Sequence, residues 1–425
     1  MSHVRSRDRF RPLLAVVLAA GGFLLSWGLI HHGPYARGRL IDTPTYADYA
    51  DKMRAGSVPY RDFAVEYPPL ALPAFLIPSL IAGNGSDFSG YERAFELLMA
   101  ACGASAMGLG VFVLARQRVG TFRLIVGVAF AALTPLLIGS VILSRYDLWP
   151  AALTISALAA IVSAKERIAF GLLALAVAAK AYPIVILPLA VVYVWRSSGR
   201  RKAIGCAAIF AAVLIACFLP FVILAPHGVW SSIRGQSSRP LQIESLGASI
   251  LLAAHQLIGT HLSLIISHGS ENLNGHPATR LGLVLSLLQI AAVLLVWLLF
   301  VFGPATQQRL LVASTAAVCA FVVFDSVLSP QYLIWLAPLV VALPATRGLA
   351  ATGLLALATG LTKIWFPALF WLLTRFETVP SWAVIGRNLV LLALFATLAW
   401  PELPIRRSVR VGPRLTNTAS TVGGR

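Results

Sequence analysis

The chain has 425 residues, of which 58% are hydrophobic and 12% are charged, and its mean hydropathy is +0.81. A soluble domain of this length could not bury so much apolar side-chain surface. Apolar runs of about 20 residues recur and predict a polytopic, all-α membrane protein rather than a β-barrel, whose segments are short and alternating. The net charge of +18 arises from basic clusters between these runs, which indicates membrane orientation and contact with anionic lipid rather than nucleic-acid binding.

The first apolar run extends from about residue 12 to residue 30 and follows the basic segment "RSRDRFR". It resembles the core of a signal peptide, but it is longer and lacks a clear small-residue cleavage site, so we expect a retained membrane span. Because Lys and Arg favour the cytoplasmic side, we place the N-terminus in the cytoplasm. The chain is then expected to emerge outside near His31.

The predicted first outer loop, residues 32–91, contains the polar stretch "DTPTYADYADKMRAGSVPYRDFAVEYPPL". We expect a helix capped by Asp42 or Thr43. The charged residues of this helix predict a solvated face: Asp48, Asp51, Lys52 and Arg54. The following run, residues 68–82, is short and contains four prolines, which remove helix hydrogen bonds. It is therefore expected to lie at the outer interface or to dip into it.

Alternation of apolar runs with basic clusters predicts about twelve transmembrane helices. The expected crossings are residues 12–30, 93–115, 121–143, 147–164, 167–181, 182–195, 203–224, 281–303, 309–328, 331–345, 348–370 and 383–400. An even number of crossings places both termini of a multi-pass plasma-membrane protein in the cytoplasm. We expect a single domain over residues 1–405 and a disordered cytoplasmic tail over residues 406–425.

A second outer segment is predicted over residues 225–280. Its polar stretches, 225–245 and 267–280, flank an expected interfacial helix at 246–266. Polar residues outside the basic clusters thus gather on the predicted outer side. A channel or transporter needs polar residues through the whole membrane depth, so the one-sided pattern favours an active site at the outer face.

The sequence shows no convincing nucleotide-binding or metal-binding motif. The cysteines lie in apolar runs without metal-ligand spacing and are expected to be small buried hydrophobes: Cys102, Cys206, Cys217 and Cys319. We therefore expect no cofactor and no metal. A lipid phosphate that carries an activated group, with its tail in the bilayer, fits such a protein.

Asp42 follows the first span at the membrane surface. An acid there could take a proton from a substrate hydroxyl while a lipid-borne donor approaches from the side. An ordinary loop acid or helix cap is the simpler alternative. In "EYPPL", Glu66 faces either the site or the solvent, and Tyr67 suits an interface anchor.

Arg145 and Asp147 in "SRYDLW" could pair with each other, or Arg145 could bind a phosphate through its planar fork. Lys180 in "AAKAYP" is a lone cation near the outer end of an apolar run, where a functional role is the first expectation and snorkelling the alternative. Further polar candidates on the predicted outer side are Tyr182, His227, Arg239, Glu244 and Gln331.

Five segments occur in this order: "IDTPTYADYADKMRAGSVPYRDFAVEYPPLALP", "SRYDLWPAAL", "AKAYPIVILPL", "RPLQIESLGAS" and "SPQYLIWLAPL". Together, over about residues 10–400, the set resembles bacterial integral-membrane glycosyltransferases of family 87 in the glycosyltransferase-C superfamily. That family includes polyprenol-phosphate-mannose-dependent mannosyltransferases of the actinobacterial cell envelope.

The resemblance implies a multi-helix fold with interfacial helices in an outer loop. It implies transfer of a sugar from a polyprenyl-phosphate donor to a glycolipid or glycan acceptor outside the cytoplasm. It also implies that Asp42 deprotonates the acceptor hydroxyl, with inversion at the sugar. Arg145, Lys180 and Arg239 then become candidates for binding the donor phosphate, with His227 as an assisting donor. Metal-dependent members of the superfamily use acidic pairs, and no clear pair occurs in this sequence.

Two other classes stay open at this point. A transporter or lipid-linked sugar flippase would need a through-going polar path and usually an internal repeat. A structural or assembly protein would use the first loop to bind a partner. Within the enzyme class, arabinofuranose, glucose or galactose could replace mannose, and the acceptor could be a phosphoinositide glycolipid, a polysaccharide or a protein.

Overall fold

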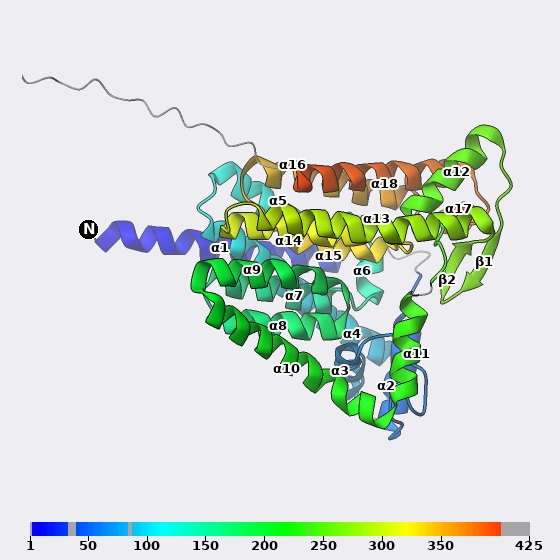
Figure 1. Ribbon diagram of the computed structural model, residues 1–425, viewed down its shortest axis with the longest axis horizontal. Coiled ribbons are helices and arrows are strands. Elements are labelled where there is room, and N and C mark those ends of the chain that lie inside the picture. Colours follow the sequence, from blue (N-terminus) through cyan, green and yellow to red (C-terminus); the bar gives the residue numbers. More distant parts are fainter. Residues whose placement is uncertain (1, 33–39, 84–86, 238, 401–425) are drawn as a thin grey trace, which may run out of the picture.

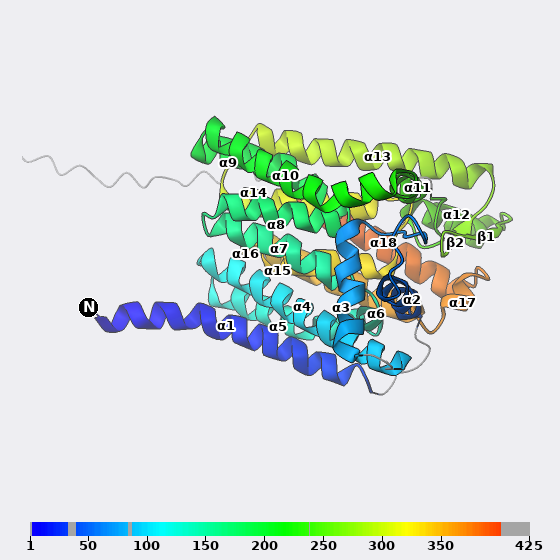
Figure 2. The ribbon, with the colours of Figure 1, turned by 90° about the horizontal axis from the view of Figure 1, so that it is seen from below.

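The computed structural model describes residues 2–32, 40–83, 87–237 and 239–400, which form a helical bundle with one small β-hairpin (Figure 1). Most long helices run along the same axis, and the N-terminus lies at one end of it (Figures 1 and 2). The opposite end, which we call the loop end, carries several short elements. These are α2 (Thr43–Arg54), α3 (Leu72–Ala82), α6 (Val141–Ser144), α11 (Pro226–Ser237), α12 (Leu246–Ile258), β1 (Leu264–Ser267), β2 (Ser270–Leu273) and α17 (Phe370–Leu373).

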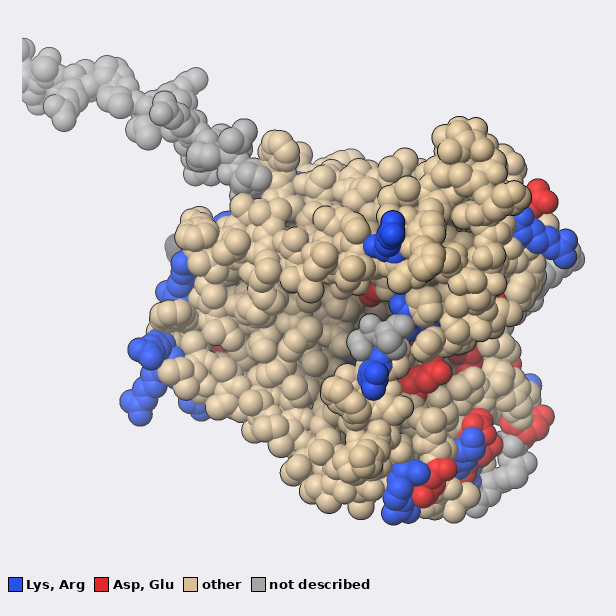
Figure 3. All heavy atoms as spheres, turned by 45° about the vertical axis from the view of Figure 1, so that its right-hand side comes forward, with Lys and Arg blue, Asp and Glu red and all other residues tan. Residues whose placement is uncertain are grey.

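Seven helices in the described part of the chain are long and apolar enough to cross a membrane. They are α1 (Ser2–Leu29), α4 (Phe88–Arg116), α5 (Thr121–Ile138), α10 (Arg200–Leu224), α13 (His276–Val301), α16 (Ala345–Trp365) and α18 (Thr378–Ala399). Figure 3 shows a broad uncharged band across one face, with charged side chains gathered toward its two ends. Such a band suits contact with lipid. The prediction of an all-α polytopic membrane protein is confirmed.

The other predicted crossings are shorter helices. They are α7 (Leu148–Val162), α8 (Glu166–Ala179), η3 with α9 (Tyr182–Ile186 and Leu187–Ser198), α14 (Gln307–Val323), and η4 with α15 (Pro330–Tyr332 and Leu333–Val341). All nine residues of α15 are buried, and this helix packs against α4, α5, α7, α14 and α16. Nine residues rise only about 14 Å, less than half of the roughly 30 Å hydrocarbon core. Helix α15 is therefore an internal core element that brings η4 to the loop end.

Small residues let α4 lie close to its neighbours. A Cβ atom at Gly103 would collide with the Phe23 ring of α1. A Cβ atom at Gly110 would lie 2.9 Å from the Pro338 carbonyl oxygen of α15. Close backbone approach at small residues is the usual basis of helix packing in membranes. These contacts hold α1 and α15 close against α4.

The first loop contains the predicted helix and the predicted proline-rich segment. Lys52 donates to Asp48 at 2.6 Å on the exposed face of α2, which confirms the solvated face. After the 3-10 turn η2 (Pro69–Ala71), α3 runs across the direction of α1 and α4 (Figure 2). Asp42 occupies the N-cap position of α2 but makes no side-chain cap hydrogen bond, so the expected capping role is wrong for this carboxylate.

The second segment differs from expectation in two places. The polar stretch 225–245 contains helix α11, which the sequence analysis did not predict. The expected helix 246–266 ends at Ile258 because Gly259 takes the left-handed conformation (φ 70°), and the chain then enters the hairpin. The predicted tail, residues 406–425, lies outside the described residues.

Candidate functional site

The site is built at the loop end from elements far apart in the sequence. Asp42 begins α2, Arg145 and Asp147 lie in the turn between α6 and α7, and Lys180 ends α8. Arg239 follows α11. A helix ends or begins at each of the first four residues, so the backbone leaves the apolar bundle where these side chains can reach polar partners.

Asp42 and Arg145 form an ion pair through Asp42 Oδ2 and Arg145 Nη1. The Tyr46 hydroxyl also donates to Asp42 Oδ2 at 3.4 Å. The Arg145 side chain is only 13% exposed, against 31% for Asp42. Burial lowers the pKa of Arg145 to about 10, while the charges of Asp147 and Glu244 oppose this shift, so the guanidinium stays charged at neutral pH. Of the two alternatives that the sequence left open for Arg145, a pair with Asp147 is not formed, because Arg145 pairs with Asp42.

Asp147 pairs with Lys180 instead. Lys180 Nζ donates to Asp147 Oδ1 at 2.7 Å, and Trp335 Nε1 donates to the same oxygen at 2.5 Å. The Asp147 carboxylate is fully buried, and its Oδ2 atom has no protein partner among the described residues. Lys180 is thus not the lone cation that the sequence suggested. Its partner lies 33 residues away, at the start of the preceding helix.

Aromatic rings surround the Lys180 ammonium group. Its Nζ atom lies 4.7 Å from the Tyr146 ring centroid, 4.9 Å from that of Trp335 and 5.7 Å from that of Tyr332. Tyr332 and Trp335 stack at 4.1 Å. Ring faces attract cations, so this cage holds the ammonium group in place. The three aromatic residues were missed in the sequence, although the spacing of Tyr332 and Trp335 puts both on one helix face.

Arg239 is held by the β-hairpin. Its Nη2 atom donates to the His268 carbonyl oxygen at 3.1 Å and to Ser270 Oγ at 3.2 Å. The positive charge of Arg239 acts on Asp325, which lies in the loop before η4. Burial raises the pKa of Asp325 to about 6, and Arg239 opposes that rise.

Three cations converge here, because Lys180 experiences the like charges of both Arg145 and Arg239. The Nε atoms of Arg145 and Arg239 are buried and have no partner among the described residues. A buried N–H group without an acceptor costs roughly 1–3 kcal/mol. An anionic ligand that accepts from both groups would remove that cost, so the arrangement is suited to binding a phosphate.

Several predicted site residues have other surroundings. The Tyr182 hydroxyl forms a hydrogen bond with Thr154 Oγ1 at 3.0 Å, and the Tyr182 ring stacks on Trp335. Tyr182 therefore supports the aromatic cage around Lys180. The Gln331 side-chain oxygen accepts from Ser329 Oγ at 3.0 Å. His227 is exposed on the first turn of α11, a helix about 18 Å long, at the end away from Arg239.

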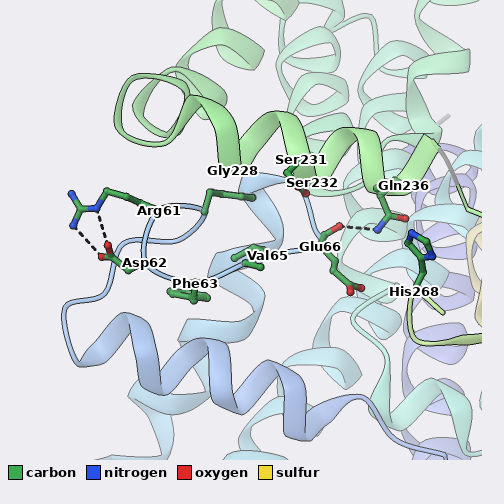
Figure 4. Close-up of a pocket in the computed structure, with 13 residues that line it drawn as sticks. Arg61, Asp62, Phe63, Val65, Glu66, Gly228, Ser231, Ser232, Gln236 and His268 are labelled. Carbon is green, nitrogen blue, oxygen red and sulfur yellow. Dashed lines mark hydrogen bonds and ion pairs between the residues drawn. The ribbon is translucent and has the colours of Figure 1, made fainter. Parts of the chain in front are cut away.

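The side chains of Glu66 and Tyr67 have different surroundings at the loop end. Tyr67 is not an exposed interface anchor, because its ring packs within 5.8 Å of Tyr46 and 5.1 Å of Tyr146. Glu66 is exposed, and its backbone oxygen accepts from Gln236 Nε2 at 3.0 Å. It lines a groove of about 380 Å³ between residues 60–66 and α11 (Figure 4).

Glu244 is a buried acid on which the charges of Arg387 and Arg145 act. It is 1% exposed, and its Oε2 atom accepts from Gln242 Nε2 at 2.8 Å. Its backbone oxygen accepts from Arg387 Nη2 at 2.8 Å and from Asn388 Nδ2 at 3.1 Å. Arg387 was missed in the sequence, although a single arginine inside the apolar run of α18 was a usable signal.

The pH dependence of stability should report on Glu244. Burial raises its pKa to about 8, with Arg387 opposing, whereas an unfolded glutamate titrates near about 4.3. Between these values the folded state binds the extra proton, so stability should fall as pH rises. We expect the melting temperature to drop from pH 5 to pH 9, and Glu244→Gln to flatten the drop. The exposed Glu377→Gln variant should keep the wild-type slope, and identical slopes in all three proteins would contradict the assignment.

No family model matches the chain, and no curated protein matches it. Among solved structures, the chain is similar to a crystal structure of ArnT from Cupriavidus metallidurans bound to undecaprenyl phosphate. The two are 16% identical, the match covers 91% of this chain and 76% of that chain, and the TM-score is 0.46. Membership of glycosyltransferase family 87 stays a prediction.

Proposed function

We propose that this protein is a membrane glycosyltransferase of the glycosyltransferase-C type. It moves a sugar, with mannose as our assignment, from a polyprenyl-phosphate donor to a glycolipid or glycan acceptor at the outer face of the membrane. One observation carries the proposal: an acid, Asp42, is joined to Arg145 beside two further cations, Lys180 and Arg239. The buried Nε–H groups of the two arginines have no acceptor among the described residues and could donate to a phosphate.

The donor phosphate would bind between Arg145 and Arg239. As the bond between the sugar and the phosphate oxygen breaks, the leaving polyprenyl phosphate takes the electron pair and its negative charge grows. Preplaced cations stabilise charge that develops in a transition state, which is often the largest electrostatic contribution to catalysis. Lys180 adds a third positive charge, and its aromatic cage fixes its position.

Asp42 would act as the general base. In the free protein its carboxylate is engaged by Arg145. A phosphate that accepts from Arg145 competes for this guanidinium and leaves Asp42 able to take the proton of an acceptor hydroxyl. The acceptor oxygen then bonds to the anomeric carbon on the face opposite the leaving phosphate, which gives inversion. The apolar helices around the bundle suit delivery of a donor from the bilayer.

Transfer can be measured directly in membranes that contain the protein. Radiolabelled polyprenyl-phosphate-mannose should pass its label to an endogenous glycolipid or glycan, and membranes without the protein should not show this transfer. Label transfer from another polyprenyl-phosphate sugar, but not from the mannose donor, would correct the sugar alone. If no donor in a panel of mannose, glucose, galactose and arabinofuranose gave transfer, the proposal would be wrong and a flippase would become the better reading.

A further inference from the structure

We propose that the groove between residues 60–66 and α11 binds a neutral, hydroxyl-rich glycan (Figure 4). Its role as the acceptor site rests on the proposed function, whereas glycan binding itself does not. The groove holds about 380 Å³, which is within the range of small-molecule sites.

The inner end of the groove lies beside the cation cluster. Glu66 and His268 meet there, and the His268 carbonyl oxygen accepts the hydrogen bond of Arg239. On the other wall, Tyr67 follows Glu66 and packs against Tyr146, the residue next to Arg145. A ligand in the groove would therefore present its inner end toward the charges that surround the proposed donor phosphate.

The lining of the groove contains both polar and apolar residues, which matches the two kinds of group on a sugar ring. Ser231, Ser232 and Gln236 of α11 offer hydroxyl and amide groups along one side. Residues 60–66 line the other side and include two apolar residues, Phe63 and the buried Val65. A sugar ring has hydroxyl groups at its edge and C–H groups on its face, so both kinds of wall can be used together. Convergent polar groups in an otherwise apolar cleft are typical of ligand sites.

Charge selects against an anionic ligand. The Arg61 guanidinium is neutralised by Asp62, with contacts of 2.9 and 3.0 Å. Glu66 is then the remaining full charge among the lining residues, and it is negative. Like charges disfavour binding, so Glu66 disfavours a phosphate-bearing group placed beside it in the groove. The chemistry favours an oligosaccharide over the anionic part of a phosphoinositide.

The walls of the groove are preformed. Tyr60 takes a left-handed conformation (φ 67°), and its hydroxyl donates to the Tyr67 carbonyl oxygen at 2.6 Å. Gly228 of α11 approaches the Tyr60 carbonyl oxygen so closely that a Cβ atom there would collide with it. A site that is already ordered loses little conformational entropy on binding, which suits weak polar ligands.

Gly235 offers a test that spares the fold. It lines the groove, and a Cβ atom added to it meets no atom within 4 Å. Gly235→Phe should therefore occupy part of the groove, and its Cβ atom meets no neighbour. Ile233→Phe is the matched control, because Ile233 is half-exposed on the same helix and does not line the groove.

Binding is measured on the full-length protein in lipid nanodiscs by saturation-transfer difference NMR. The probes are mannotriose, maltotriose and galactotriose, with inositol 1-phosphate and a neutral serine-rich peptide for comparison. At least one trisaccharide should bind the wild type, bind Gly235→Phe at least tenfold more weakly, and bind Ile233→Phe equally well.

Absence of trisaccharide binding, or binding that is insensitive to Gly235→Phe, would overturn the proposal. Preferential binding of the peptide or of inositol phosphate would do so too. Groove-dependent trisaccharide binding in a protein that transfers no sugar would uphold the glycan site and reject the proposed function, so the two failures can be told apart.

Discussion

Asp42→Asn should reduce the turnover number by about 10²–10⁴-fold, the usual contribution of a general base. Asparagine keeps the shape of the side chain but cannot accept the acceptor proton at neutral pH. It also releases Arg145 from its ion pair, so donor binding should be retained or strengthened. The check is transfer from a saturating concentration of labelled polyprenyl-phosphate sugar, with donor binding measured separately.

Asp48→Asn is the matched control for this experiment. Asp48 lies on the same helix, its side chain is 54% exposed, and it pairs only with Lys52 in the described contacts. Its substitution should leave turnover unchanged. Wild-type turnover in a folded Asp42→Asn protein would remove Asp42 as the base, and Glu66 would be the next acid to test.

Lys180→Met should destabilise the protein by about 3–5 kcal/mol, because it leaves the fully buried Asp147 carboxylate without its charge partner. Adding Asp147→Asn removes the uncompensated charge while keeping an oxygen for the Trp335 N–H group. The double variant should therefore recover most of the lost stability. Unfolding in detergent, followed by the loss of tertiary structure, gives the three free energies and their coupling.

The exposed pair Lys52–Asp48 provides the comparison, since its side chains are 44% and 54% exposed. Lys52→Met should cost no more than about 1 kcal/mol, as exposed pairs usually do. The double variant at positions 147 and 180 should stay inactive in sugar transfer even when stable, because the third cation is missing. Equal costs for Lys180→Met and Lys52→Met, or an active double variant, would contradict the role given to Lys180.

The sequence predicted the helical class and the position of most helices, because length and hydrophobicity decide whether a segment is apolar enough for a membrane. It also placed Asp42, Arg145, Lys180 and Arg239 among the candidates. It could not predict which charge pairs with which. Asp147 joins Lys180 across 33 residues and Trp335 across 188, and such contacts depend on helix packing rather than on local pattern.

The wrong predictions likewise concern single residues and tertiary contacts rather than the pattern of apolar runs. The helix expected over 246–266 was too long because one left-handed glycine, Gly259, ends it in the middle of an apolar run. Helix α11 was missed because it is short and contains two glycines, which disfavour a helix. Its packing against the first loop at Gly228, which also forms the groove, is a tertiary contact that no local signal reports.

The Asp147–Lys180 pair also bears on how the chain enters the membrane during synthesis. Both partners belong to one helical hairpin, α7 followed by α8, so they can meet as soon as that hairpin has been made. Two charges that would each oppose insertion are then presented to the bilayer as one neutral unit. Trp335 is synthesised much later and completes the hydrogen bonding of a pair that is already in place. The order of the chain thus lets biogenesis tolerate a buried acid and a buried base at the heart of the proposed active site.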